Sequence, residues 1–169
     1  MRKVLVALLF VLPIGLCHAQ SAPARPAEPT AIGVVYRLDP ATQELKRLPD
    51  EEWKESQGAR NPGDLYVVVT GGQSTFRIKA GDKIEFVFNT GSPEKVSLYG
   101  FIQKKSERRF EFQKQPSTWK MEVAIVKGLT IDVSKFGESS YKLVPASPLA
   151  PGEYAIIIAG NLYSFGVDQ

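Results

Sequence analysis

The chain has 169 residues but only one cysteine and one histidine, and these two are neighbours, Cys17 and His18. Both fall in a stretch that we expect to be removed on export, so the mature protein has neither residue type. An exported domain of about 150 residues without cysteine relies on its hydrophobic core and not on disulfides. Without histidine, the usual Ser–His and Cys–His pairs and the blue copper ligand set are excluded.

The N-terminus has the regions of a secretory signal peptide, which we place at residues 1–19. Two basic residues precede the apolar run, and Cys17-His18-Ala19 offers small residues before cleavage at Gln20. The run has about 13 residues, whereas roughly 20 are needed for a helix that spans a bilayer. Lipidation of Cys17 is an alternative, although Leu16 is larger than the residue that normally precedes a lipidated cysteine. We expect an exported protein, periplasmic or secreted.

A strong charge of one sign is also missing. The precursor has 21 basic and 18 acidic residues, and loss of Arg2 and Lys3 leaves 19 against 18, a formal charge of +1. This balance gives no general argument for nucleic acid as a partner. Residues 20–31 are rich in proline and alanine and are expected to form a flexible tether. The folded domain is therefore expected at residues 32–169, with no transmembrane segment in the mature chain.

Short stretches rich in β-formers, separated by turn residues, continue from Ile32 to the C-terminus. In residues 83–88 apolar side chains recur with a period of two, which is typical of a strand with one buried face. We predict an all-β, immunoglobulin-like antiparallel β-sandwich with one short helix. The predicted strands are residues 32–38, 43–48, 65–70, 75–79, 83–88, 95–103, 110–114, 119–126, 130–133, 141–146, 153–159 and 162–167.

The one predicted helix covers residues 50–57. Asp50 is a suitable N-cap, and Glu51 and Glu52 favour the positive end of a helix. Such a helix has about two turns, so tertiary packing of Trp53 would have to stabilise it.

A corner motif near the C-terminus supports the sandwich prediction. In Leu149-Ala-Pro151-Gly152-Glu-Tyr154, proline fixes φ and glycine permits a sharp turn before a β-rich run. This is typical of the corner before the penultimate strand of immunoglobulin-like sandwiches, where the tyrosine hydrogen-bonds back across the turn. We assign Leu149, Pro151, Gly152 and Tyr154 a structural role.

The corner belongs to a wider set of motifs, which includes residues 36–42, 76–82 and 136–143, Pro148-Leu-Ala-Pro-Gly-Glu-Tyr154 and the ending Phe165-Gly-Val-Asp168. This set resembles a family of uncharacterised secreted bacterial β-sandwich proteins, and it covers patches of most of the mature chain. Members often have a cysteine where this chain has Ser164. The resemblance implies an exported β-sandwich and carries over no function.

Catalysis and cofactor binding find little support. A strand, an Ala-Gly-Asp turn and a second strand within residues 76–88 look like part of a cupredoxin, but the copper ligands are missing. We expect no metal and no other cofactor, and we expect the protein not to be an enzyme. A small carboxylate-dependent hydrolase is the least favoured alternative, because among 18 acidic residues some pair must lie close together by chance.

The densest basic stretch contains Lys104, Lys105, Arg108 and Arg109, with Trp119 further along the chain. One hypothesis is a hairpin that binds a polyanion, with aromatic rings for stacking. The alternative is a solvated hairpin tip whose charges keep the sheet soluble and its edge unpaired. These four cations and Trp119 are the candidate ligand contacts under the first hypothesis.

The sequence therefore favours a non-catalytic exported domain that contacts another envelope or extracellular macromolecule. The leading hypothesis is a protein partner that meets the surface or an exposed sheet edge, as antiparallel sheets permit. The alternative is a module that binds a polysaccharide or another anionic polymer.

Overall fold

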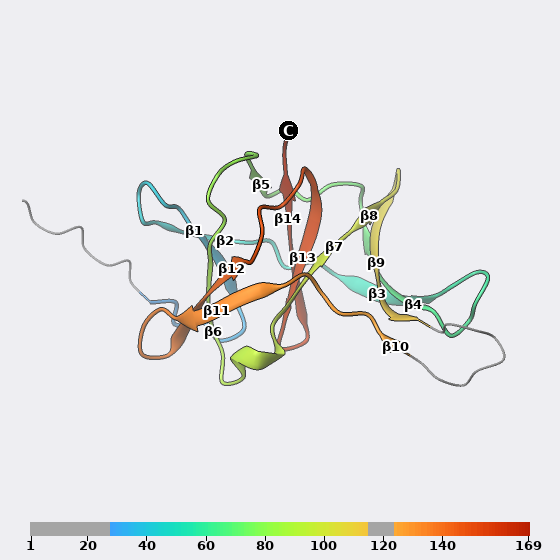
Figure 1. Cartoon of the computed structure of the whole chain (residues 1–169), viewed down its shortest axis with the longest axis horizontal. Helices are drawn as coiled ribbons and strands as arrows, with labels where there is room; N and C mark the ends of the chain where they lie inside the picture. Colours follow the sequence, from blue (N-terminus) through green and yellow to red (C-terminus); the bar gives the residue numbers. More distant parts are fainter. Residues whose placement is uncertain (1–27, 115–123) are drawn as a thin grey trace, which may run out of the picture.

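The computed structural model describes residues 28–114 and 124–169, so the signal peptide, most of the tether and Trp119 lie outside the described residues. The described part is nearly all β, with three sheets (Figure 1), which confirms the all-β sandwich. The elements are β1 (Val35–Leu38), β2 (Leu45–Arg47), β3 (Trp53–Gln57), β4 (Leu65–Thr70), β5 (Arg77–Ile78), β6 (Phe86–Asn89), the 3-10 turn η1 (Pro93–Lys95), β7 (Ser97–Gly100), β8 (Ile102–Gln103), β9 (Glu107–Lys114), β10 (Ala124–Ile125), β11 (Ile131–Lys135), β12 (Ser140–Pro145), β13 (Gly152–Ile158) and β14 (Asn161–Val167).

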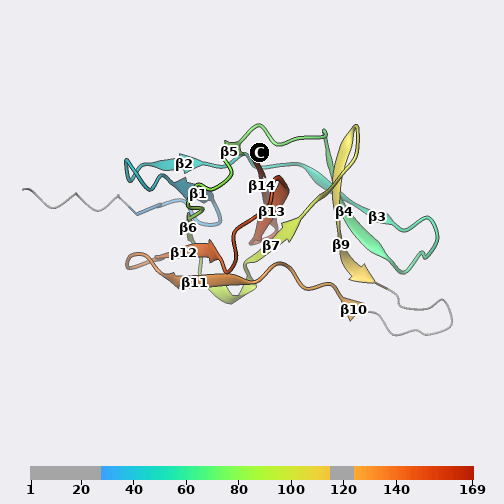
Figure 2. The same cartoon turned by 45° about the horizontal axis from the view of Figure 1, so that its top comes forward.

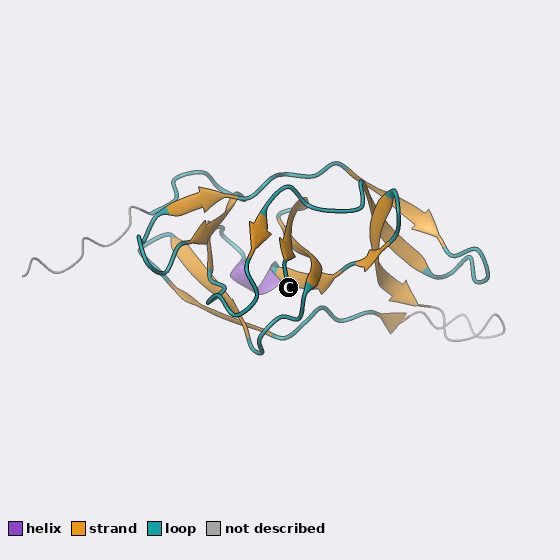
Figure 3. Ribbon diagram, turned by 90° about the horizontal axis from the view of Figure 1, so that it is seen from above, coloured by secondary structure: helices purple, strands orange, loops and turns teal. Residues whose placement is uncertain are grey.

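The three sheets lie side by side along the molecule. One has the order β11-β12-β6-β1-β2, and a second has the order β10-β9-β4-β3 with β8 also paired to β9. The third has the order β5-β14-β13-β7, and β5 pairs with β14 in parallel whereas β13 pairs with its neighbours antiparallel. Figures 1 and 3 show this third sheet between the other two, so both of its faces are covered.

The alternation of side chains along β13 and β14 creates two cores. Ile156 and Phe165 point to one face and pack with residues of β1, β6 and β12. Ala155 and Leu162 point to the other face and pack with Val67 and other residues of β4 and β9. Successive residues of a strand point to opposite faces, so one hairpin supplies both cores and joins the two outer sheets.

The helix predicted at residues 50–57 is wrong, because this segment is extended. Asp50 forms an isolated β-bridge with Tyr163, and the whole of β3 pairs antiparallel with β4. The Glu51 N–H donates to the Leu162 carbonyl at 2.9 Å. A helix of about two turns has little stability of its own. Hydrogen bonds to neighbouring strands therefore decide the conformation.

The strand predicted at residues 83–88 forms in part, as β6, but it is not buried on one face alone. Val87 is fully buried together with the two phenylalanines, and Glu85 is 5% exposed. Burial would raise the pKa of Glu85, but hydrogen bonds from Lys83 and Lys142 outweigh it and lower that pKa. β6 lies in the middle of its sheet, between β12 and β1. The alternation predicts that Glu85 faces solvent. Its two lysine partners instead allow its carboxylate to be buried.

Candidate functional site

The predicted tyrosine corner is present. The Tyr154 hydroxyl donates to the Ala150 carbonyl at 2.7 Å, and burial raises the pKa of Tyr154, which keeps the hydroxyl protonated as a donor. Gly152 begins β13, and Leu149 packs against the larger core. The corner thus anchors the loop between β12 and β13, as the sequence predicts.

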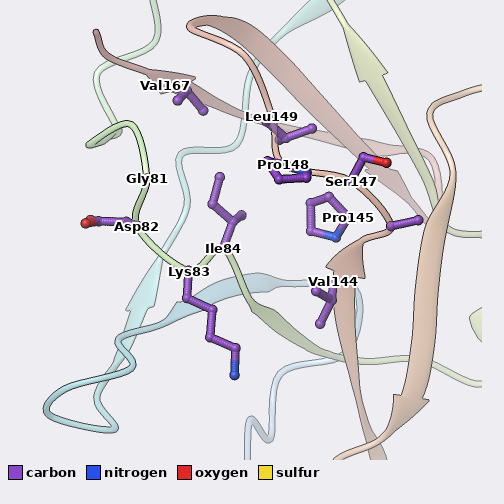
Figure 4. Close-up of a pocket in the computed structure, with 11 residues that line it drawn as sticks. Gly81, Asp82, Lys83, Ile84, Val144, Pro145, Ser147, Pro148, Leu149 and Val167 are labelled. Carbon is purple, nitrogen blue, oxygen red and sulfur yellow. The ribbon is translucent and has the colours of Figure 1, made fainter.

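That loop forms one wall of a groove of about 360 Å³. Figure 4 shows Ile84 facing Pro148 and Leu149 across the groove, while Lys83 points away from it. Asp82 and Lys83 also belong to the lining, and the Lys83 ammonium pairs with Glu85 at 3.0 Å. The groove is thus mainly apolar, and it presents no charge pattern that selects one ligand.

The basic stretch is divided by the fold. Lys104 and Lys105 are exposed near the turn between β8 and β9, and Lys104 pairs with Glu107 at 3.6 Å. Arg108 and Arg109 lie on β9 and point to opposite faces of it. The structure therefore does not bring the four cations together on one surface.

Arg108 is 1% exposed and lies between the central sheet and β9. Its Nη2 donates to Glu51 Oε1 at 3.1 Å, its Nη1 donates to Ser164 Oγ at 3.0 Å, and its Nε donates to the Gly71 carbonyl at 3.0 Å. The Ser164 hydroxyl in turn donates to Glu51 Oε1 at 2.5 Å. The guanidinium also lies over the Phe101 ring, 5.3 Å from its centroid. This side chain is a structural ion and is not available to a ligand.

Glu153 extends this buried cluster toward the C-terminus. Its carboxylate lies 3.6 Å from Arg108 and accepts a hydrogen bond from the Ser74 N–H at 2.7 Å. Arg77 pairs with the other carboxylate oxygen and also with Asp168. Glu153 is 4% exposed and fully engaged with cations, so it does not face a cleft as the acid of a hydrolase must.

Arg109 is held on the outer face of the second sheet. Its guanidinium lies 4.7 Å from the centroid of the Tyr66 ring, a cation–π geometry. The Tyr66 hydroxyl donates to Glu111 at 3.3 Å, and burial together with the charge of Glu111 raises the pKa of Tyr66. The exposed part of the basic stretch is therefore limited to its lysines.

One edge of the second sheet is β3. The Gly58 N–H donates to the Asp64 carbonyl at 2.8 Å, and bonded residues alternate along an antiparallel pair. Lys54 and Ser56 therefore direct their backbone groups toward β4. The outward backbone N–H and C=O groups belong to Trp53, Glu55 and Gln57, and within residues 28–114 and 124–169 no other strand pairs with this side.

An acidic groove of about 570 Å³ begins at the first residue of β3. It lies between residues 50–53 and the turn that joins β13 to β14, and Asp50, Glu51, Glu52 and Trp53 line it. Trp53 is 41% exposed. Since Glu51 is paired with Arg108, Asp50 and Glu52 give the groove its negative charge.

Two further properties concern the part of the chain that the structure describes. There, no group of three or more His, Cys, Asp or Glu residues has the arrangement of a metal site. No helix there has the length and hydrophobicity needed to cross a membrane.

Comparison with known proteins gives no relative: no family model, no curated protein and no solved structure matches this chain.

Sequence patterns missed both the β3 edge and the acidic groove. Trp53-Lys-Glu-Ser-Gln57 has no alternation of apolar and polar residues that marks a strand. The buried cluster of Arg108 and Glu51 was also missed, because its members are 57 residues apart in the sequence. The only sequence feature that points to this groove is the acidic run Asp50-Glu-Glu52 before Trp53, and the sequence analysis interpreted that run as the start of a helix.

Proposed function

We propose that this protein is a non-catalytic exported domain that binds an extended, positively charged segment of another exported protein at the β3 edge. The observation that carries the proposal is the outward-facing backbone of the edge strand β3, which lies beside an acidic groove. The carboxylates of Asp50 and Glu52 and the exposed Trp53 line that groove. Export is supported by the N-terminal sequence.

The two parts of this surface have different roles. Backbone groups of an added strand continue the sheet and provide affinity that depends little on sequence. The groove selects charge, because a lysine or arginine of the partner meets carboxylates there and the face of Trp53 attracts a cation. A basic, extended polypeptide satisfies both parts at once.

A second copy of the chain fits this edge poorly. In a two-fold antiparallel pair, residues with outward backbone groups must oppose one another. Around Glu55 this places two glutamates directly opposite each other, and a shift of one pair places the two Lys54 side chains opposite each other. Like charges in directly opposed positions are destabilising, so the registers around Glu55 and Lys54 are disfavoured. A register around Ser56 opposes no like charges, but it overlaps only residues 55–57 of the strand.

The test uses capped synthetic peptides and the chain from Gln20 onward, the expected mature form. We expect a peptide of alternating lysine and valine to bind and to shift the amide NMR signals of Trp53, Glu55 and Gln57. A peptide of alternating glutamate and valine is expected to bind much more weakly, because the groove repels it. Equal binding of the two peptides would contradict the proposal.

Two variants separate the backbone contribution from the charge contribution. Glu55→Pro removes an outward N–H that does not pair with β4, so it should abolish peptide binding while the fold persists. Glu52→Lys should raise the Kd for the lysine peptide about fivefold, the effect of losing one exposed charge pair. Glu44→Lys, on the distant β1–β2 hairpin, is the matched control and should leave the Kd unchanged.

Heparin is the probe for the anionic-polymer alternative. Binding of heparin that disappears when Lys104 and Lys105 become alanine, with no binding of the lysine peptide, would replace the protein-binding proposal by that alternative.

A further inference from the structure

The five-stranded sheet has its own free edge at β11. β11 pairs with β12 on one side, and no strand among the described residues pairs with its other side. Figure 2 shows β11 along the lower side of the molecule, away from β3. The two edges belong to different sheets, so contacts at one leave the other free.

The hydrogen bonds of the β11–β12 pair show which backbone groups are unused. The Phe136 N–H donates to Ser140 at 3.0 Å, and the Ala146 N–H donates to Thr130 at 3.0 Å. Bonded residues alternate in an antiparallel pair, so Asp132 and Ser134 also turn toward β12. The outward N–H and C=O groups are those of Ile131, Val133 and Lys135.

Apolar side chains accompany these outward groups. Val133 is 37% exposed, and Ile131 is partly buried against the larger core. Both line a groove of about 410 Å³ whose other wall includes Pro93 and Glu94 of η1. The groove therefore lies beside the free edge, and it has space for side chains of an added strand.

We propose that the protein forms a two-fold symmetric dimer in which β11 pairs antiparallel with β11 of a second copy, Val133 opposite Val133. This register pairs the residues with outward backbone groups, since Ile131 then lies opposite Lys135 of the second copy. It joins the two five-stranded sheets into one continuous sheet. Because opposed residues of paired strands point to the same face, Val133 and Ile131 of the second copy extend the apolar lining of the groove.

The charges of β11 match this self-pairing. Asp132 lies opposite Ser134 of the second copy, a carboxylate facing a hydroxyl donor, and no like charges are directly opposed. Lys135 of the second copy lies beside Ile131, in the groove whose rim carries Glu94. The two Asp132 side chains are diagonal neighbours, about 7–8 Å apart in such a pair. They weaken the dimer without preventing it.

Sedimentation equilibrium of the chain from Gln20 onward, over a wide range of concentration, tests the proposal. We expect a reversible monomer–dimer equilibrium. Val133→Lys sets two lysines directly opposite each other and should raise the dimer Kd more than tenfold. Asp132→Asn removes the diagonal repulsion and should lower it about twofold. Ile125→Lys makes the same change at an exposed strand residue of another sheet and should leave the Kd unchanged.

Val133→Lys could also weaken the dimer by disturbing the fold, so a second variant, Val133→Cys, tests the same contact by forming a bond. The mature chain has no other cysteine, and opposed residues of an antiparallel pair lie within the Cα separation that a disulfide spans. Under mild oxidation Val133→Cys should form a covalent dimer much faster than Ile125→Cys. A monomeric wild-type chain at every concentration, equal dimerisation of Val133→Lys and the wild type, or equal rates for the two cysteine variants would overturn the proposal.

Discussion

At the residue scale, Arg108 carries a full charge into an interior that nearly excludes water. Burial of an ion is costly unless hydrogen bonds and opposite charges compensate it. Here Glu51, Glu153, Ser164 and a backbone carbonyl surround the guanidinium. The cluster joins β9 to β13 and β14 of the central sheet by polar contacts, beside the smaller hydrophobic core.

Removal of this cation should be strongly destabilising. We expect Arg108→Ala to lower the free energy of unfolding by about 3–5 kcal/mol, because it leaves Glu153 buried with one counter-ion fewer. Urea denaturation followed by circular dichroism measures this. Lys105→Ala, an exposed cation of the same stretch, is the matched control and should change the free energy by less than about 0.5 kcal/mol. A loss below about 1 kcal/mol for Arg108→Ala would show that the cluster contributes little beyond its packing.

At the element scale, the turn between β11 and β12 binds a carboxylate from the N-terminal side of the domain. Glu28 accepts hydrogen bonds from the Glu138 N–H at 2.6 Å, the Ser139 N–H at 3.2 Å and the Ser140 hydroxyl at 2.9 Å. Gly137 lies directly beneath this carboxylate, where a Cβ atom would collide with it. The turn therefore fixes the start of the described chain to the five-stranded sheet.

The attachment of Glu28 should depend on pH. Hydrogen bonds from Glu138, Ser140 and Ser139 lower its pKa below the ordinary value of 4.5. A lowered folded-state pKa means that the attachment is complete above pH 4.5 and is lost as the pH falls through the folded-state pKa. NMR titration of the Glu138 and Ser139 amide shifts measures this midpoint.

Glu28→Gln should abolish the titration of these two amides, whereas Glu44→Gln should leave it intact. A midpoint at or above 4.5 in the wild type would show that the carboxylate is not held by the turn in solution.

At the scale of the whole molecule, the central sheet separates the edge strands β3 and β11 of the two outer sheets. When β3 meets itself around Glu55 or Lys54, like charges are directly opposed, whereas β11 paired with itself around Val133 opposes none. The structure therefore supports one surface for a foreign basic strand and another for a second copy. Both proposals depend on backbone groups that the sheets leave unpaired among the described residues.

The two surfaces should act independently. We expect Val133→Lys to bind the lysine–valine peptide with the wild-type Kd, and Glu55→Pro to dimerise with the wild-type Kd, because sites far apart with no shared contacts are additive. Isothermal titration calorimetry and sedimentation equilibrium provide the two constants. A change of more than about threefold in the peptide Kd of Val133→Lys or in the dimer Kd of Glu55→Pro would indicate coupling between the two outer sheets.

Local chemistry accounts for the parts of the fold that the sequence predicted well. Leu65–Thr70 is a strand because it is apolar and β-branched, and Tyr154 closes its corner because proline and glycine fix the turn before it. The basic stretch is different. Lys104 and Arg108 have similar charges in the sequence, yet one is exposed and the other is buried.

The sequence by itself determined the β content, the turns and the corner, since these depend on the conformational preferences of neighbouring residues. Only the tertiary structure decided that residues 50–57 are extended, because their hydrogen-bond partners are Leu162 and the residues of β4. It also decided which strands are edges and which cations are buried. Those properties depend on which distant segments meet, and no local pattern encodes that.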